Sequence, residues 1–111
     1  MTISVCLATY NGQRYLDEQL RSILDQLGPD DEVIISDDAS TDDTLSVARA
    51  ARDRRVRILD LTDRVGYSKN FERAVSAATG EIIFLSDQDD VWLPGKVERM
   101  VADTARSKFF E

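Results

Sequence analysis

Four short apolar runs alternate along the chain with four segments of helical periodicity. The runs span residues 3–9, 32–36, 56–60 and 82–86, and short connections separate them from the helical segments. Such an alternation predicts parallel strands with helices on both faces of the sheet, because each helix carries the chain back to the end where the strand began. We therefore predict an α/β, Rossmann-like fold with the strand order 3-2-1-4 of a nucleotide-binding half-fold.

Glycine, proline and serine residues predict where the helices begin and end. Gly28-Pro29 is expected to end the first helix and Gly80 the third. Ser40 is placed to cap the second helix, and Pro94 occupies a helix-starting position for the fourth. Residues 3–9 are rich in branched apolar side chains, which is typical of a central strand buried on both faces.

The chain has 111 residues, no histidine and a net charge of -7. The acidic balance argues against a nucleic-acid partner, since nucleic acids are bound through basic surfaces. The lack of histidine excludes Ser-His-Asp and Cys-His sites within the chain. The one cysteine, Cys6, lies in an apolar run, so we expect a buried, inert thiol and a reducing compartment. No run approaches the ~20 apolar residues of a membrane span.

The fourth apolar run leads directly into the acidic stretch Ser86-Asp87-Gln88-Asp89-Asp90. Carboxylates this close repel one another at neutral pH unless a cation lies among them. On an extended backbone, Asp87 and Asp89 would project to the same side and Asp90 away from them. Carboxylate oxygens suit Mg²⁺ or Mn²⁺ when phosphates and water supply the other ligands. The pattern indicates metal-assisted handling of a phosphorylated ligand, with a solvated turn as the alternative.

Two further polar segments follow strands at the same predicted end of the sheet. Tyr10-Asn11-Gly12 follows the first run and Asp37-Asp38 the second. In open α/β sheets, ligands bind beyond the carboxyl ends of the strands, where the strand order reverses. Tyr10 is a candidate for stacking on a base and Asp38 for contacting a base or ribose, although both are also common loop and turn residues. No G-x-G-x-x-G or Walker A sequence is present, so neither a nicotinamide site nor a P-loop is supported.

Several longer motifs occur together and in a fixed order. They are residues 4–12, residues 33–42, residues 66–70, and residues 78–82 leading into the acidic stretch at 87–90. In this combination the chain resembles the inverting family-two glycosyltransferases of the GT-A fold, and the resemblance covers nearly the whole chain. The form of residues 87–92 is similar to a subgroup associated with bacterial surface polysaccharides, including rhamnosyl transfer.

The resemblance implies that the chain binds a nucleotide-diphosphate sugar donor. Ala8 and Tyr10 would border the base, Asp38 would contact the base or ribose, and Lys69 with Asn70 would lie beside the diphosphate and sugar. The substrate-binding residues implied are Ala8, Thr9, Tyr10, Asn11, Asp38, Gly66, Lys69, Asn70, Asp87 and Gln88.

The resemblance also implies a divalent cation, Mg²⁺ or Mn²⁺, held by Asp87 and Asp89, with Asp89 as the direct ligand. The reaction implied is a single in-line displacement at the anomeric carbon. The acceptor would be a hydroxyl group of a saccharide or lipid-linked saccharide, deprotonated by a carboxylate. That base lies downstream of the D-x-D pair in the family, so no catalytic residue is assigned within the chain.

We therefore expect residues 1–111 to be the N-terminal nucleotide-sugar-binding part of a longer, cytoplasmic enzyme. A peripheral position at the inner face of the cell membrane is kept as an alternative, and no membrane span is expected in this part. Two other functions stay open. A receiver-type signalling domain would need paired aspartates after the first strand and would have to accept phosphate on Asp60. A non-catalytic nucleotide-sugar binding module would explain why no base is assigned.

Overall fold

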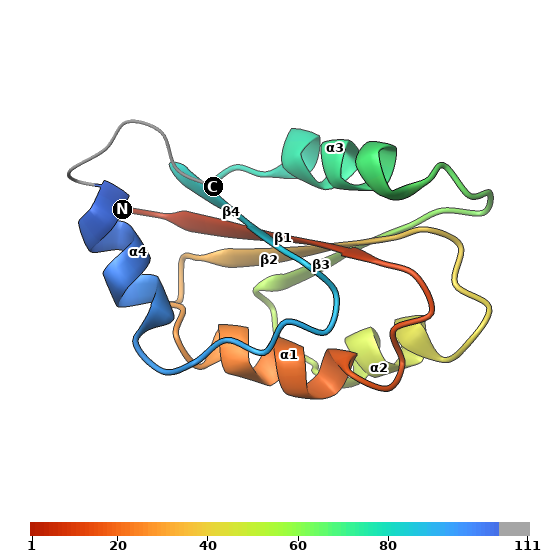
Figure 1. Ribbon diagram of the computed structural model, residues 1–111, viewed down its shortest axis with the longest axis horizontal. Coiled ribbons are helices and arrows are strands. Elements are labelled where there is room, and N and C mark those ends of the chain that lie inside the picture. The colour runs from red at the N-terminus through yellow and green to blue at the C-terminus, as the bar shows by residue number, and fades with distance from the viewer. Residues whose placement is uncertain (105–111) are drawn as a thin grey trace.

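The computed structural model describes residues 1–104, which form a four-stranded parallel sheet flanked by helices (Figure 1). The strands are β1 (Ile3–Thr9), β2 (Glu32–Asp37), β3 (Val56–Asp60) and β4 (Ile82–Ser86). The helices are α1 (Leu16–Leu24), α2 (Thr44–Ala50), α3 (Tyr67–Ala77) and α4 (Lys96–Thr104). The strand order is β3-β2-β1-β4 and each pairing is parallel. The predicted fold class and strand order are confirmed.

β1 lies inside the sheet because nearly all of its side chains are apolar and both of its faces are covered. All seven of its residues are buried, and β2 and β4 pair with its two edges. The register places Val5 beside Val33 of β2 and Phe84 of β4, which are 0% and 1% exposed. β3 is an edge strand and is only partly buried. β1 is therefore an interior strand of the sheet, with its carboxyl end between those of β2 and β4.

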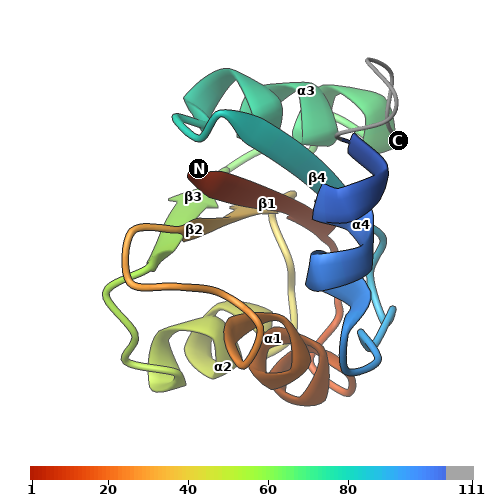
Figure 2. The same cartoon turned by 90° about the vertical axis from the view of Figure 1, so that its left-hand side faces the viewer.

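Helices cover both faces of the sheet (Figure 2), with α1 and α2 on one face and α3 on the other. Side chains alternate along a strand. Val5 and Leu7 accordingly pack with Leu20 of α1 in the larger core cluster, which Val97 of α4 also joins. Cys6 faces the other way and packs in a smaller cluster with α3.

The thiol of Cys6 is buried and chemically quiet. It is 0% exposed. Burial raises the pKa of this thiol to about 11, so it is protonated at neutral pH. The prediction of a buried, inert cysteine is confirmed. No helix within residues 1–104 is long and apolar enough to cross a lipid bilayer.

The first helix is shorter than its sequence pattern predicted. α1 ends at Leu24, before Gly28-Pro29. The guanidinium group of Arg55 donates to the backbone carbonyls of Leu24 and Leu27 at 3.1 and 2.9 Å. A side chain from another part of the chain therefore binds carbonyl groups at and just beyond the helix end, where intrahelical donors run out. The third helix likewise ends before the predicted Gly80.

The predicted cap of the second helix is wrong. Ser40 lies before α2, and its hydroxyl donates to Asp37 at 2.6 Å instead of capping the helix. Asp42 takes over part of that task, since its carboxylate accepts the backbone N–H of Thr44 at 3.0 Å. The fourth helix begins at Lys96, after the predicted Pro94.

Candidate functional site

A pocket of about 260 Å³ lies beyond the carboxyl ends of β1 and β2. This end of the sheet is on the right-hand side of Figure 1. The lining residues come from the ends of three strands, the loop before α3 and the start of α3; they are Ala8, Thr9, Tyr10, Asp38, Arg64, Tyr67, Asn70 and Gln88. Most of the predicted substrate-binding residues are therefore brought together in one place.

A buried hydrogen-bond network joins the ends of β1 and β2 beneath the pocket. Asp37 is 0% exposed, and its carboxylate accepts the hydroxyl of Thr9 at 2.7 Å and that of Ser40 at 2.6 Å. The same Ser40 oxygen accepts the backbone N–H of Asn11 at 2.9 Å. The amide oxygen of Asn11 in turn accepts the N–H of Thr41 at 2.8 Å. Asn11 thus ties two loops together and does not line the pocket.

Asp38 is a buried carboxylate whose partners come from the loop before α3. It is 2% exposed and accepts the backbone N–H groups of Val65 at 2.7 Å and Gly66 at 3.0 Å. Burial alone would raise the pKa of Asp38, but these hydrogen bonds and Arg64 together lower it below its usual value. Asp38 is therefore ionised. Gly66 donates its backbone N–H to Asp38 and does not line the pocket itself. The φ angle of Gly66, 92°, favours glycine here.

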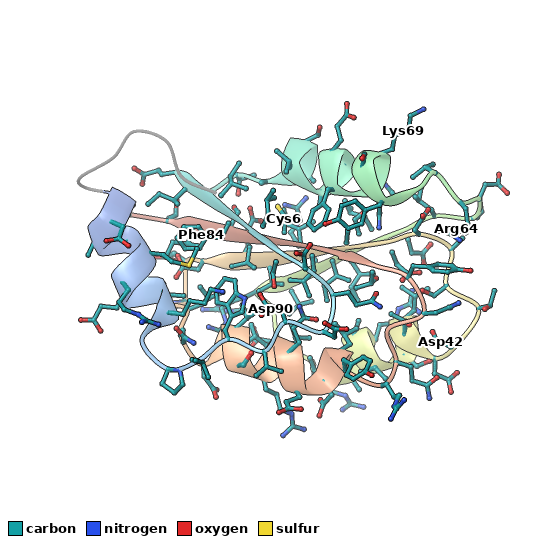
Figure 3. The ribbon with its side chains drawn as sticks, in the orientation of Figure 1. Cys6, Asp42, Arg64, Lys69, Phe84 and Asp90 are labelled. Carbon is teal, nitrogen blue, oxygen red and sulfur yellow. The ribbon has the colours of Figure 1, made fainter. Side chains whose placement is uncertain are left out.

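Arg64 closes one side of the pocket. Its guanidinium carbon lies 3.6 Å from the centre of the Tyr10 ring, and its Nε donates to Asp38 at 3.4 Å. In Figure 3, Arg64 lies beyond the carboxyl ends of the strands, whereas Lys69 points outward from α3, away from the sheet. Lys69 is exposed and does not line the pocket, so Arg64 is the basic side chain in the pocket lining among the described residues.

Asn70 lies on the inner side of α3, against the end of β1. It is 2% exposed, and its Nδ2 donates to the carbonyl of Thr9 at 3.4 Å. Its Oδ1 is buried and has no hydrogen-bond partner among residues 1–104. Asn70 therefore connects the third helix to the pocket floor.

Gln88 and Gln19 hold the acidic stretch in place from two sides. Gln88 Oε1 accepts the backbone N–H of Tyr10 at 2.8 Å. The buried Gln19 of α1 donates through Nε2 to the carbonyl of Asp87 at 2.6 Å and to the hydroxyl of Ser86 at 3.2 Å. The acidic stretch is therefore tied to the end of β1 through its own Gln88 and to α1 through Gln19.

The expectation of an extended backbone through the aspartates is wrong. β4 ends at Ser86, and the chain then turns, with the N–H of Asp90 donating to the carbonyl of Asp87 at 3.2 Å. Asp89 has a φ of 63°, in the left-handed region. The turn sends Asp90 toward Lys96, whose Nζ is 3.7 Å from its carboxylate. Asp87 and Asp89 are exposed. The alternation of an extended strand therefore does not decide where their side chains point.

Two exposed carboxylates fit a divalent cation only if other groups complete its coordination. Residues 1–104 contain no group of three or more His, Cys, Asp or Glu side chains that could hold a metal ion on its own. Oxygen ligands in small number are what Mg²⁺ and Mn²⁺ accept when phosphate and water fill the remaining positions. The donor set of Asp87 and Asp89 fits such an ion and does not fit a site made entirely of protein ligands.

The sequence of this chain is similar to proteins of one known family. A family model described as Glycosyl transferase family 2 matches residues 4–108. The chain belongs to this family. The dTDP-rhamnosyl transferase RfbG of Shigella flexneri is 36% identical over 102 residues, which cover 86% of this chain and 35% of the relative.

Solved structures of glycosyltransferases share the fold. TarS of S. aureus, residues 1–349 in complex with UDP, superposes with a TM-score of 0.85 at 30% identity, over 96% of this chain and 32% of TarS. The mannosyltransferase PcManGT from Pyrobaculum calidifontis, in complex with GDP-Man and Mn²⁺, gives 0.84 at 31% identity, over 93% of this chain and 32% of its own. The chain thus spans about a third of the length of the proteins that it matches.

Membership of this family overturns the receiver-type alternative. Asp60, the residue that a receiver would phosphorylate, ends the edge strand β3 and forms an ion pair with Arg49 at 3.1 Å. The family model instead spans the loops and strand ends that form the pocket.

Sequence reasoning missed two residues of the site. Tyr67 lines the pocket and donates its hydroxyl to Asp87, and Gln19 holds the carbonyl of Asp87. Gln19 sits on the buried face of an amphipathic helix, where a polar residue among Leu16, Leu20 and Ile23 was the available signal. Tyr67 carried no such signal, because its partner is twenty residues away in the chain.

Proposed function

We propose that this chain binds the nucleotide-diphosphate sugar donor of an inverting, metal-dependent glycosyltransferase. The observation that carries the proposal is the position of the pocket in a family 2 chain. It lies at the carboxyl ends of the strands, and Gln88, which separates Asp87 from Asp89, is part of its lining. If the nucleoside part of the donor lies in the pocket, the diphosphate of the donor would be directed toward these two exposed carboxylates.

The residues of the pocket have separate tasks in this proposal. The ring of Tyr10 offers a stacking surface for the base, and the ionised Asp38 offers acceptor oxygens. Asp87 and Asp89 would hold Mg²⁺ or Mn²⁺ together with the phosphate oxygens. When bound, such an ion neutralises the negative charge that develops on the departing nucleoside diphosphate. The complexes of TarS with UDP and of PcManGT with GDP-Man and Mn²⁺ support this assignment.

The transfer step needs a base that we do not assign to the described residues. In the proposed displacement, the acceptor oxygen bonds to the anomeric carbon as the bond to the diphosphate breaks, and the hydroxyl proton passes to a carboxylate. Asp38 is the one carboxylate among the described residues that line the pocket, and its lowered pKa makes it a poor base. We propose that the base and the acceptor site belong to the part of the enzyme that this chain does not span.

The wider setting is also a proposal. We propose transfer of a hexosyl or rhamnosyl group to a saccharide or lipid-linked saccharide acceptor, in the cytoplasmic synthesis of cell-surface polysaccharide. The similarity to a dTDP-rhamnosyl transferase supports the rhamnosyl alternative.

Titration calorimetry tests donor binding. UDP, GDP and dTDP would each be titrated into the chain with MnCl₂ and then with EDTA. We expect at least one nucleoside diphosphate to bind more tightly with Mn²⁺, and the matching nucleoside to bind with no metal dependence, because it lacks the phosphates that complete the coordination. Binding that is equally metal-independent for nucleoside and diphosphate would contradict the proposed function.

A further inference from the structure

Tyr67 connects the start of α3 to the acidic turn after β4. Its hydroxyl donates to Oδ1 of Asp87 at 2.5 Å. Tyr67 also lines the nucleotide-facing pocket on one side, and on the other it lines a neighbouring hollow of about 590 Å³ together with Asp87. The phenol is therefore the one side chain that borders both hollows in the described part of the chain.

The ring of Tyr67 packs against another aromatic ring although Tyr67 is 65% exposed. It packs edge-on against Phe71, one helical turn later, with ring centres 5.0 Å apart and an angle of 76° between the planes. The backbone before it is anchored as well, because Asp38 accepts the N–H groups of Val65 and Gly66. The hydroxyl thus reaches Asp87 from a support that is ordered by other contacts.

The Asp87 residue is restrained at both its backbone and its side chain. Gln19 donates to its carbonyl at 2.6 Å, and Tyr67 occupies one oxygen of its carboxylate. Within residues 1–104, the other carboxylate oxygen has no protein donor within hydrogen-bond distance. A hydrogen bond on one oxygen fixes the rotamer and leaves the second oxygen to face a cation.

We propose that Tyr67 is a positioning residue that orients the Asp87 carboxylate toward the cation of the donor site. The inference rests on the proposed function. An exposed aspartate that is already oriented loses less conformational freedom when it binds a ligand. Groups that hydrogen-bond to metal ligands typically contribute ~10–100-fold to metal affinity. Because Tyr67 is exposed and makes a single hydrogen bond, the lower end of that range applies.

Tyr67→Phe is the direct test, because it removes the hydroxyl and keeps the ring that packs on Phe71. UDP would be titrated into the unchanged chain and the variant, first with MnCl₂ and then with EDTA. We expect the affinity measured with Mn²⁺ to fall about tenfold and the affinity measured with EDTA to be unchanged. Tyr15→Phe is the matched control, since it removes the hydroxyl of a tyrosine outside the pocket and should alter neither value.

A double-mutant cycle distinguishes positioning from a general structural role. If Tyr67 acts through Asp87, then Tyr67→Phe should have no further effect on the Mn²⁺-dependent affinity in the Asp87→Asn background. The inference would be overturned if Tyr67→Phe lowered the Mn²⁺-dependent affinity equally in the unchanged chain and in the Asp87→Asn variant. It would also be overturned if Tyr67→Phe lowered the affinity measured with EDTA by the same factor. An unchanged Mn²⁺-dependent affinity in the Tyr67→Phe single variant would overturn it as well, while leaving the proposed function intact. No UDP binding by the unchanged chain, with GDP and dTDP also failing, would overturn the proposed function and this inference together.

Discussion

The guanidinium of Arg64 covers one face of the Tyr10 ring, with its central carbon 3.6 Å from the ring centre. Arg64 belongs to the loop before α3 and also donates to the buried Asp38 at 3.4 Å. A base that stacks on this face of Tyr10 must take the place of the guanidinium. The pocket therefore contains a contact that competes with its proposed ligand.

Removal of this competing contact should favour nucleoside binding. An exposed cation–π contact contributes ~0.5–1 kcal/mol, so Arg64→Ala should raise the affinity for uridine about two- to fivefold. Titration calorimetry with uridine, which carries no phosphate, isolates this effect from any attraction between Arg64 and the diphosphate. Arg14→Ala is the control, since Arg14 lies 5.6 Å over the ring of Tyr15, which does not line the pocket. A lower uridine affinity in Arg64→Ala would show that the guanidinium contacts the nucleoside.

Glu32 accepts several hydrogen bonds at the end of the sheet opposite the pocket. Its carboxylate accepts the hydroxyl of Ser4 at 2.6 Å, the backbone N–H of Thr79 at 2.7 Å and the guanidinium of Arg57 at 2.9 Å. Burial alone would raise the pKa of Glu32, but the hydrogen bonds outweigh it and lower the pKa from 4.5 to about 2. The ionised form therefore stabilises the fold.

The stability of the chain should depend on pH through Glu32. Because its pKa is lower in the folded chain, its stabilisation is complete above pH 4.5 and is lost as the pH falls to about 2. Glu32→Gln should lower the free energy of unfolding at pH 7 by up to about 3 kcal/mol and flatten its decrease in acid. Urea unfolding followed by circular dichroism measures both effects. The exposed Glu18→Gln should behave like the unchanged chain, and an unaltered acid limb in Glu32→Gln would contradict the assignment.

Gly80 allows the chain before β4 to approach the start of β1. A Cβ atom at this position would lie 2.6 Å from Oγ and 2.7 Å from the backbone nitrogen of Ser4. Since backbone cannot move aside cheaply, Gly80→Ala should destabilise the fold by ~1–3 kcal/mol. At Gly28, a Cβ would meet only the Asp31 carboxylate, at 3.4 Å, so Gly28→Ala is the matched control. Equal melting temperatures for the two variants would refute this explanation.

The fold could be predicted because its determinants are local and repeated. Residues 3–9 are apolar enough to require cover on both faces, and the structure buries all of them. The same pattern placed Tyr10 and Asp38 at one end of the sheet, where they line a common pocket. The strand order came instead from the likeness to a nucleotide-binding half-fold, because the chain reverses its direction across the sheet between β3 and β4 and leaves β1 inside.

The details of the site could not be predicted because they depend on contacts between distant residues. Lys69 and Arg64 are both cations in or near the third helix, and the sequence alone does not distinguish them. The structure shows that Lys69 faces outward from the helix, whereas Arg64, in the loop before it, reaches Tyr10. Ser40 had the right residue type for a cap, but buried Asp37 binds its hydroxyl. This hydrogen bond is local, since Asp37 is three residues before Ser40, and the burial of Asp37 is what the sequence did not show.

The turn after β4 should separate a ligand carboxylate from a structural one. Asp89 is exposed in this turn, whereas the carboxylate of Asp90 lies 3.7 Å from Lys96. Asp89→Asn should weaken Mn²⁺-dependent UDP binding by about 100-fold, and Asp87→Asn by less, because a neutral amide is a poorer ligand for a hard cation. Asp90→Asn makes the same change of charge one residue away and should leave the binding unaltered. Calorimetry on the three variants measures these values. If Asp90→Asn weakened binding as much as Asp89→Asn, the cation would respond to the total charge of the turn and not to a ligand at position 89.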